Sequence, residues 1–218
     1  MLRPNPGAGA TVAKALAAGF EARAYPLFEA VALPWAGPEP HLVDAVMFTS
    51  ANGARLGGAQ LGQYTHLPSF AVGEATAEAV REAGFASPQI GETDVQSLVH
   101  RIAADGYRNV LHIAGRDVRA FDPEGLNIIS ACAYAALEQG DAEGLSGVLP
   151  PGMILLVHSP RAGARLAELV LPEHRGHLHL VAISSAALAV CGSGWATACA
   201  AEKPRDDAML ALAAGLCE

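Results

Sequence analysis

Charged residues are scarce in this sequence, and positive ones are scarcer than negative ones. Only 17% of the 218 residues are Asp, Glu, Lys or Arg, and the formal net charge is −8. A nucleic-acid-binding protein needs a surplus of Lys and Arg on one face to neutralise phosphates. The composition therefore argues against a nucleic-acid partner, and any anionic ligand has to be held by local groups rather than by the overall field.

Several motifs are absent as well. The four cysteines show no CxxC spacing and no export signal opens the chain. We therefore expect neither a disulfide framework nor a zinc ribbon, and we expect a cytoplasmic protein. No GxGxxG follows an apolar run, no P-loop is present and no serine lies in a GxSxG elbow. Nucleotide cofactors and hydrolase chemistry thus have no positive support.

Two local features resemble metal and membrane motifs but fit them poorly. His174, His177 and His179 are crowded, yet their spacing suits no common metal site, so we expect a surface loop entering a strand and no metal. The segment Gly176–Ala201 contains no Asp, Glu, Lys or Arg, but serine, threonine and glycine interrupt it. We interpret it as strand, turn and helix rather than as a membrane span.

What the sequence does contain is a regular alternation of apolar runs and helical stretches. The apolar runs, interpreted as buried parallel strands, are Ala45–Phe48, Phe70–Val72, Val110–Ile113, Met153–Val157 and Leu178–Ile183. The helical stretches, each followed closely by a glycine that suits a left-handed cap, are Thr11–Ala18, Thr76–Ala83 and Val95–Ala104. Such alternation is typical of doubly wound α/β folds.

A weak internal repeat predicts two similar lobes. Val46–Leu56 and Leu155–Leu166 each read as a strand that ends at a serine and is followed by a helix. Two proline-marked extended segments, Pro26–Pro34 and Leu126–Leu137, flank the middle of the chain as a pair of connectors. Two connections between lobes make a hinge, and a hinged cleft is a natural ligand site. The predicted lobes are residues 1–34 plus 131–218 (outer) and 35–130 (inserted).

Polar residues follow the apolar runs at the place where a doubly wound sheet binds its ligand. Ligands lie outside the carboxyl ends of the strands, and hydroxyls and glycines at helix starts receive anions. Each hydroxyl can instead simply cap a helix, and that alternative stays open for every one of them. The candidate residues are Thr49, Ser50, Asn52, Gly73, Glu74, Thr76, Gly115, Arg116, Asp117, Ser159, Arg161, Ser184 and Ser185.

Eight segments in order along the chain resemble the uroporphyrinogen-III synthase family. They are LRP (Leu2–Pro4), AYPLFE (Ala24–Glu29), FTSANGAR (Phe48–Arg55), AVGEATAEAVREAGF (Ala71–Phe85), LHIAGRD (Leu111–Asp117), AYAALE (Ala133–Glu138), HSPRAGARLAEL (His158–Leu169) and KPRDDAMLAL (Lys203–Leu212). The specificity lies in their order and spacing, with FTSAN followed by AVGEATA as the strongest pair. The sequence departs from the family in its very short N-terminal strand and at Ser184–Ala187.

The resemblance implies a fold, a reaction and a set of site residues. The fold is two similar doubly wound, parallel-sheet, flavodoxin-like lobes joined by a two-stranded connector. The reaction cyclises the linear tetrapyrrole hydroxymethylbilane, with inversion of ring D and release of water, and uses no metal or organic cofactor. The family's functional tyrosine falls on Tyr134, whose plain alternative is a packing residue in a strand. Arg3, in the LRP segment, joins the candidates for substrate binding.

The resemblance also bears on partners. We expect a monomer that binds a small-molecule substrate and can contact the preceding enzyme of its pathway transiently. One alternative is a hinged, two-lobed binding protein of the periplasmic type without catalysis. Another is a flavodoxin-like binder of nucleotides or phosphate. The isomer of the uroporphyrin formed from hydroxymethylbilane separates these possibilities.

Overall fold

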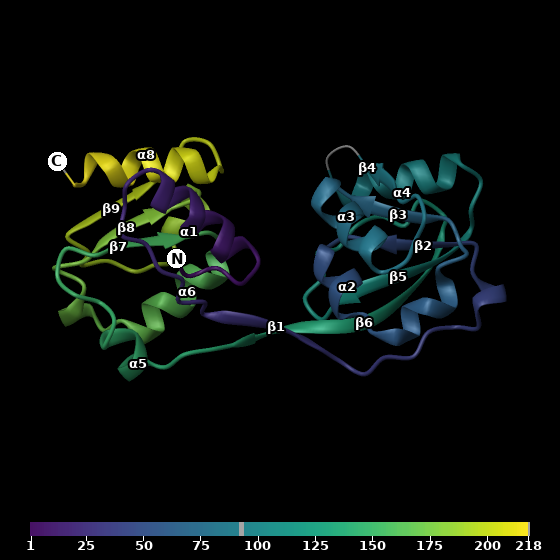
Figure 1. Cartoon of the computed structure of the whole chain (residues 1–218), viewed down its shortest axis with the longest axis horizontal. Helices are drawn as coiled ribbons and strands as arrows, with labels where there is room; N and C mark the ends of the chain where they lie inside the picture. Colours follow the sequence, from purple (N-terminus) through teal and green to yellow (C-terminus); the bar gives the residue numbers. More distant parts are fainter. Residues whose placement is uncertain (92–93, 218) are drawn as a thin grey trace. The chain divides into compact units, whose positions relative to one another are not determined.

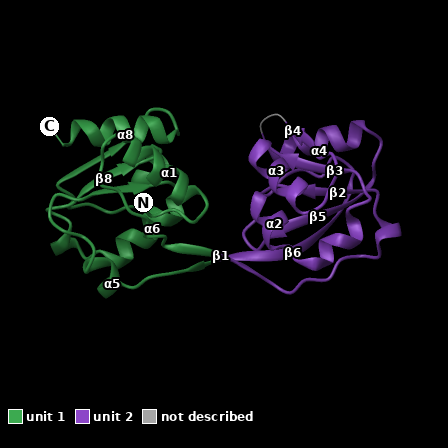
Figure 2. Ribbon diagram, in the orientation of Figure 1, with its two compact units in different colours: residues 1–29, 137–218 green, residues 30–136 purple. Residues whose placement is uncertain are grey.

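The chain divides into two compact units, each described here by itself. A computed structural model describes residues 1–91 and 94–217. Unit 1 comprises residues 1–29 and 137–218, and unit 2 comprises residues 30–136 (Figure 2). The divisions lie five or six residues from the predicted boundaries, because they fall within two strands, β1 (Phe28–Ala32) and β6 (Asn127–Glu138). Tyr134 therefore belongs to unit 2 rather than to the outer lobe.

Unit 2 contains a six-stranded sheet in the order β1-β6-β5-β2-β3-β4 (Figure 1). Its other strands are β2 (Ala45–Phe48), β3 (Ser69–Val72), β4 (Gln89–Gly91) and β5 (Asn109–Gly115). The pairs β2–β3, β2–β5, β3–β4 and β5–β6 are parallel. Two hydrogen bonds, Leu33 N to Ala133 O and Gln139 N to Leu27 O, show that β1 and β6 run in opposite directions.

Helices cover both faces of this sheet. The helices are α2 (Ala51–Leu56), α3 (Glu74–Glu82) and α4 (Val95–Ala104). The turn η1 (Pro40–Leu42) precedes β2, and the turn η2 (Ala59–Tyr64) follows α2. Val46 and Phe48 pack toward α2 and α3, whereas Ala45 and Met47 pack toward α4. Alternate residues of one strand thus bury both faces, as an apolar run without period-two alternation predicts.

Unit 1 contains a parallel sheet of three strands, β7 (Ile154–Val157), β8 (His179–Ala182) and β9 (Thr197–Ala200). Its helices are α1 (Gly7–Ala17), α5 (Ala142–Ser146), α6 (Pro160–Leu169), α7 (Ser185–Leu188) and α8 (Asp206–Gly215), with the turn η3 (Pro172–His174). Residues of α1 and α8 share one core cluster with β7 and β8. The predicted N-terminal strand is not formed, and Leu2 N donates to Leu156 O at 3.4 Å beside β7.

The sequence-based strands and helices are confirmed as parallel α/β elements, with shifted ends. Helix α1 begins four residues before the predicted Thr11, and α3 begins at Glu74 rather than Thr76. Glycines at positive φ follow these helices, with φ of 86° at Gly19 and 99° at Gly84. The segment Gly176–Ala201 is strand, short helix and a further strand, β9, which the apolar pattern did not predict.

Strand order in unit 2 differs from that of flavodoxin. Taken in chain order from β2 to β6, the five parallel strands lie as 3-2-1-4-5, whereas flavodoxin has 2-1-3-4-5. Both orders contain a point at which the winding reverses, and ligands bind there outside the carboxyl ends of the strands. In unit 2 that point lies between β2 and β5.

Candidate active site

Residues that follow β2 lie at this reversal point. Ser50 is the N-cap of α2, and its Oγ accepts from Asn52 N at 3.3 Å. Thr49 takes no part in this cap, and its Oγ1 lies 3.0 Å from Nε2 of His112 in β5. Gly53 allows α2 to approach β5, because a Cβ there would lie 2.8 Å from the carbonyl oxygen of Ile113. Thr49, Ser50 and Asn52 are all half-buried, so each is within reach of a ligand.

The neighbouring strands place Tyr134 against the end of β5. A β-bulge interrupts the pairing of β5 with β6 at Ala114 and Gly115, and Gly115 pairs with Tyr134. A Cβ on Gly115 would lie 2.6 Å from Cζ of Tyr134, so the phenol ring lies directly over the glycine backbone. Arg116 N donates to Tyr134 O at 2.9 Å, and the Arg116 side chain is exposed.

Tyr134 as a whole is half-buried, and within residues 1–91 and 94–217 no group forms a hydrogen bond with its hydroxyl. Buried tyrosine hydroxyls usually find a partner. A phenol that is held in place by its ring while its hydroxyl is unpaired can donate to a ligand.

The residues after β3 are less available. Gly73 caps α3 with φ of 75°, a conformation that favours glycine. The Glu74 carboxylate accepts two hydrogen bonds from Arg81, each at 3.0 Å. Thr76 is only 6% exposed. Of these three residues, only Gly73 is available to a ligand, through its backbone, because Glu74 is paired and Thr76 is buried.

In unit 1, the predicted residues lie after β7 and β8. Ser159 and Ser184 are the N-caps of α6 and α7, and their side chains accept from Ala162 N and Ala187 N at 3.1 and 3.3 Å. Both serines thus cap helices, as Ser50 does. Because a capping hydroxyl accepts through its oxygen, its proton is still free to donate to a ligand. Ser185 is exposed, and the Arg161 guanidinium lies 4.5 Å from the centre of the Phe28 ring.

Arg3 belongs to a cluster of charged residues at the same end of β7. Its Nη1 lies 3.4 Å from Oδ1 of Asp206, the first residue of α8, and Thr11 Oγ1 donates to Oδ2 at 2.8 Å. His158 Nε2 lies 3.2 Å from the same Oδ1, in a direction that does not make a hydrogen bond. Gly7 leaves room for Arg3, because a Cβ there would lie 2.5 Å from Nε.

Within this cluster the negative charge of Asp206 is compensated by the positive charge of Arg3. Burial lowers the pKa of His158 and Arg3 lowers it further, against the opposing effect of Asp206. Burial tends to raise the pKa of Asp206, but Thr11, His158, Arg3 and Lys14 together keep it below its ordinary value. We infer an ionised carboxylate that pairs with Arg3 beside a neutral imidazole. The side chain of Arg3 is still 34% exposed, so its guanidinium also faces solvent.

The chain matches one family along most of its length. The profile of the family described as uroporphyrinogen-III synthase HemD covers residues 9–211. The chain belongs to the uroporphyrinogen-III synthase family. Members of this family are cyclising hydro-lyases of heme biosynthesis, and the chain has this activity rather than the purely binding role of the alternatives.

Solved structures of the uroporphyrinogen-III synthase family agree in fold. The uroporphyrinogen-III synthetase of Helicobacter pylori 26695 is 17% identical, with a TM-score of 0.68 over 90% of this chain and 96% of that one. A mutant uroporphyrinogen III synthase of Thermus thermophilus is 18% identical, with a TM-score of 0.51 over 100% and 99% of the two chains. At these identities the likeness shows the fold alone. No curated protein sequence matched the chain.

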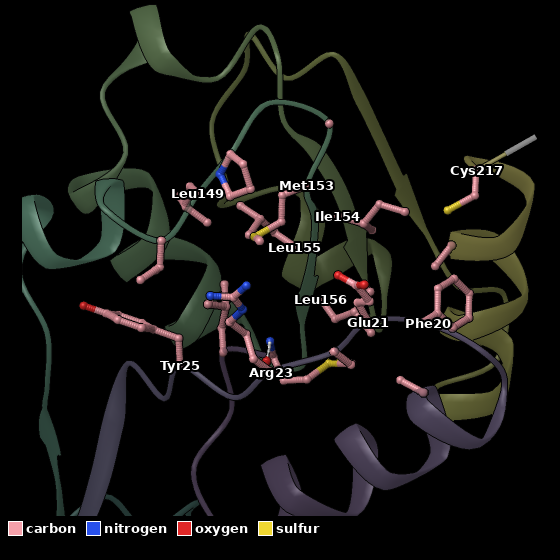
Figure 3. Close-up of a pocket in the computed structure, with 18 of the residues that line it drawn as sticks. Phe20, Glu21, Arg23, Tyr25, Leu149, Met153, Ile154, Leu155, Leu156 and Cys217 are labelled. Atoms are coloured by element: carbon pink, nitrogen blue, oxygen red, sulfur yellow. Dashed lines mark hydrogen bonds between the residues drawn. The ribbon is translucent and has the colours of Figure 1, made fainter.

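A cavity of about 390 Å³ in unit 1 lies away from the predicted residues. Figure 3 shows it beside the start of β7, lined by Phe20, Leu149, Met153 and Ile154, with Arg23 and Glu21 among the lining residues. The site expected from the uroporphyrinogen-III synthase resemblance lies instead at the carboxyl ends of the strands. We therefore assign none of the chemistry to this cavity. Among the described residues, no helix is long and apolar enough to cross a membrane.

Sequence reasoning missed four residues that lie beside the candidate residues Thr49 and Arg3. His112 is completely buried beside Thr49, Asp206 pairs with Arg3, and Thr11 and His158 contact Asp206. A signal existed for His112, since an ionisable residue inside the apolar run Val110–Ile113 demands a partner. No comparable signal existed for Asp206, because 203 residues separate it from Arg3.

Proposed function

We propose that the chain cyclises hydroxymethylbilane to uroporphyrinogen III with Tyr134 as its proton donor. The observation that supports this role is the unpaired hydroxyl of the half-buried Tyr134, whose ring lies against the bare backbone of Gly115. The hydroxyl of ring A departs as water once it receives a proton, and leaves an azafulvenium cation. The substituted carbon of ring D then attacks this cation, and the resulting spiro intermediate fragments and recloses with ring D inverted.

Positioning supplies much of the rate in this proposal. The linear substrate is flexible, and holding its two ends together is worth about 7 to 11 kcal/mol in effective-molarity terms. General acid catalysis adds about 10²- to 10⁴-fold. Tyr134 therefore accelerates the departure of the hydroxyl, while the binding groups select the folded conformation of the substrate from which ring D reacts. Loss of the phenol leaves a slower enzyme rather than an inactive one.

The eight carboxylates of the substrate need local donors, because the net charge of the chain is −8. We assign this role to polar groups at the carboxyl ends of the strands in both units. The capping serines retain a free proton, and three arginines supply charge-assisted contacts. The proposed binding residues are Arg3, Thr49, Ser50, Asn52, Gly73, Glu74, Thr76, Gly115, Arg116, Ser159, Arg161, Ser184 and Ser185. Within this set, we expect Glu74 and Thr76 to contribute least.

We further propose that the two units are similar lobes joined by β1 and β6 as a two-stranded connector. Equivalent pairings support the similarity, since Phe48 pairs with Ala71 in unit 2 and Val157 pairs with Ala182 in unit 1. Both Phe48 and Val157 are the last strand residues before a capping serine helix. The flavodoxin-like label then describes the winding of each lobe rather than its strand order.

The remaining proposals concern location and partners. We propose that the chain acts in the cytoplasm as a monomer, takes the linear tetrapyrrole as its substrate, and meets the preceding enzyme of the pathway transiently. Light scattering of the purified protein measures the oligomeric state. Cross-linking to the preceding enzyme during turnover measures the contact, and fractionation of cells places the protein.

One assay tests the function directly. The purified protein is incubated with enzymatically generated hydroxymethylbilane, and the oxidised products are resolved into type I and type III uroporphyrins. We expect type III product in proportion to the amount of protein, above the type I background of spontaneous closure. If type I alone forms at every protein concentration, the proposed function is wrong.

A further inference from the structure

The contact between Thr49 and His112 has a direction that the positions of its heavy atoms leave open. Thr49 Oγ1 and His112 Nε2 are 3.0 Å apart, and either atom can be the donor. His112 is completely buried, and burial lowers its pKa to about 4, so the imidazole is neutral at physiological pH. A neutral imidazole carries one proton, on Nδ1 or on Nε2.

The surroundings of Nδ1 favour one of these two tautomers. Nδ1 has no hydrogen-bond partner in the described part of the chain, and the ring packs edge-on to Phe121 at 5.8 Å. A proton on Nδ1 would leave a buried N–H unpaired. Among backbone groups an unpaired buried N–H is rarer than an under-satisfied acceptor, and we apply the same preference to the imidazole. The proton therefore belongs on Nε2, where it has Thr49 as its acceptor.

The direction of this bond decides what Thr49 can offer to a ligand. A hydroxyl has a single proton, and an ionised carboxylate only accepts hydrogen bonds. If Thr49 gave its proton to His112, it would face a substrate carboxylate with lone pairs alone. If His112 donates to Thr49, the hydroxyl proton is free to point outward, and the two bonds in series strengthen each other.

We propose that His112 is a positioning residue, which donates from Nε2 to Thr49 and so commits the Thr49 hydroxyl to donating to a substrate carboxylate. The identity of the carboxylate rests on the proposed function, but the direction of the bond does not. Ser50, one residue further along the chain, has no such partner among the described residues and accepts only the cap bond from Asn52. Thr49 and Ser50 thus become donors by different routes.

Nitrogen NMR of the imidazole rings tests the direction without any substrate. Long-range ¹H–¹⁵N spectra of protein labelled at its eight histidines distinguish protonated from unprotonated ring nitrogens, and the spectrum of His112→Phe assigns the signals. We expect protonated Nε2 and bare Nδ1 for His112. A proton on Nδ1 would overturn the proposal whatever the activity of the protein.

A pair of amide substitutions tests the consequence for binding. The amide nitrogen of Gln reaches approximately the place of Nε2, whereas that of Asn reaches the place of Nδ1. His112→Gln should therefore keep the KM for hydroxymethylbilane, and His112→Asn and His112→Phe should raise it about two- to tenfold with little change in kcat. Equal KM values for the Gln and Asn variants, with both folded by circular dichroism, would contradict the role of Nε2.

Removal of Thr49 shows whether His112 acts through it. Thr49→Val should raise KM by a similar factor, and adding His112→Phe should raise it no further. Independent, multiplying effects in the double variant would overturn the coupling. If the parent protein makes no type III product, the proposed function fails, and the nitrogen spectra still decide the direction of the bond.

Discussion

The two units place different residues after equivalent strands. In unit 2, Thr49 follows β2 and contacts a buried, neutral histidine. In unit 1, His158 follows β7 and lies beside the Asp206 carboxylate that pairs with Arg3. The first arrangement leaves a hydroxyl proton available, and the second satisfies its charges internally. Under the proposed function, unit 2 would carry the proton chemistry and unit 1 would contribute an arginine paired with the Asp206 carboxylate.

Replacement of tyrosine by phenylalanine should have the largest effect on turnover, but only at Tyr134 in unit 2. Tyr134→Phe keeps the ring over Gly115 and removes the proposed donor, so turnover to type III product should fall about 100-fold, at the lower end of general acid catalysis. Tyr25→Phe makes the same change in unit 1, beside the cavity of Figure 3, and should leave turnover intact. Equal turnover of the parent and Tyr134→Phe would return Tyr134 to a packing role.

Neutralising the half-buried Asp206 carboxylate should destabilise unit 1. Asp206→Asn removes the partner of Arg3 and an acceptor of Thr11, and should lower the free energy of unfolding by about 1 to 3 kcal/mol. Asp207→Asn is the matched control, because its side chain is 63% exposed and should change stability by less than about 0.5 kcal/mol. Urea denaturation measures both, and equal losses would remove the distinction between the two carboxylates.

The buried histidine of unit 2 should make stability depend on pH. The pKa of His112 in the folded chain is about 4, below the unfolded value of about 6.5, so the unfolded chain binds more protons between these values. Its contribution is complete above about pH 6.5 and is lost as the pH falls toward 4, by roughly 2 kcal/mol between pH 7 and 5.

His112→Phe should remove this part of the pH dependence, because phenylalanine does not titrate. The comparison uses chemical denaturation of the parent and the variant at pH 7 and pH 5. His158 contributes to both proteins and cancels in the difference. Parallel pH profiles would mean that His112 is already accessible to protons in the folded chain.

The smallest expected effect concerns the orientation of Arg3. Gly7→Ala places a Cβ where the guanidinium lies, whereas Gly9→Ala meets Asn5 Oδ1 at an ordinary 3.8 Å. Gly7→Ala should therefore raise KM for hydroxymethylbilane about two- to fivefold, equivalent to about 1 kcal/mol or less of binding. Gly9→Ala should leave KM unchanged. Identical KM values for the two variants would show that the placement of Arg3 is unimportant.

The sequence predicted the strands and the polar residues that follow them, because both depend on the pattern of apolar and polar residues over a few positions. Ala45–Phe48 is a continuous apolar run, and Ser50 follows it at the capping position, so burial and helix start could be read together. The strands β4 and β9 were missed, because their sequences, QIG and TACA, contain no run of large apolar residues like those of the predicted strands. The clusters around Arg3 and Thr49 were missed for another reason. Their members are far apart in the sequence, and only folding brings them into contact.

The close contact of Gly115 and Tyr134 limits which substitutions the site tolerates. Any side chain at position 115 occupies the volume of the phenol ring, so Gly115→Ala should disturb Tyr134 even though glycine itself has no reacting group. The side chains at positions 115 and 134 compete for the same space, so a larger residue at 115 requires a smaller one at 134. A mutational scan would therefore find position 115 as intolerant as a residue that performs chemistry, although its contribution is empty space.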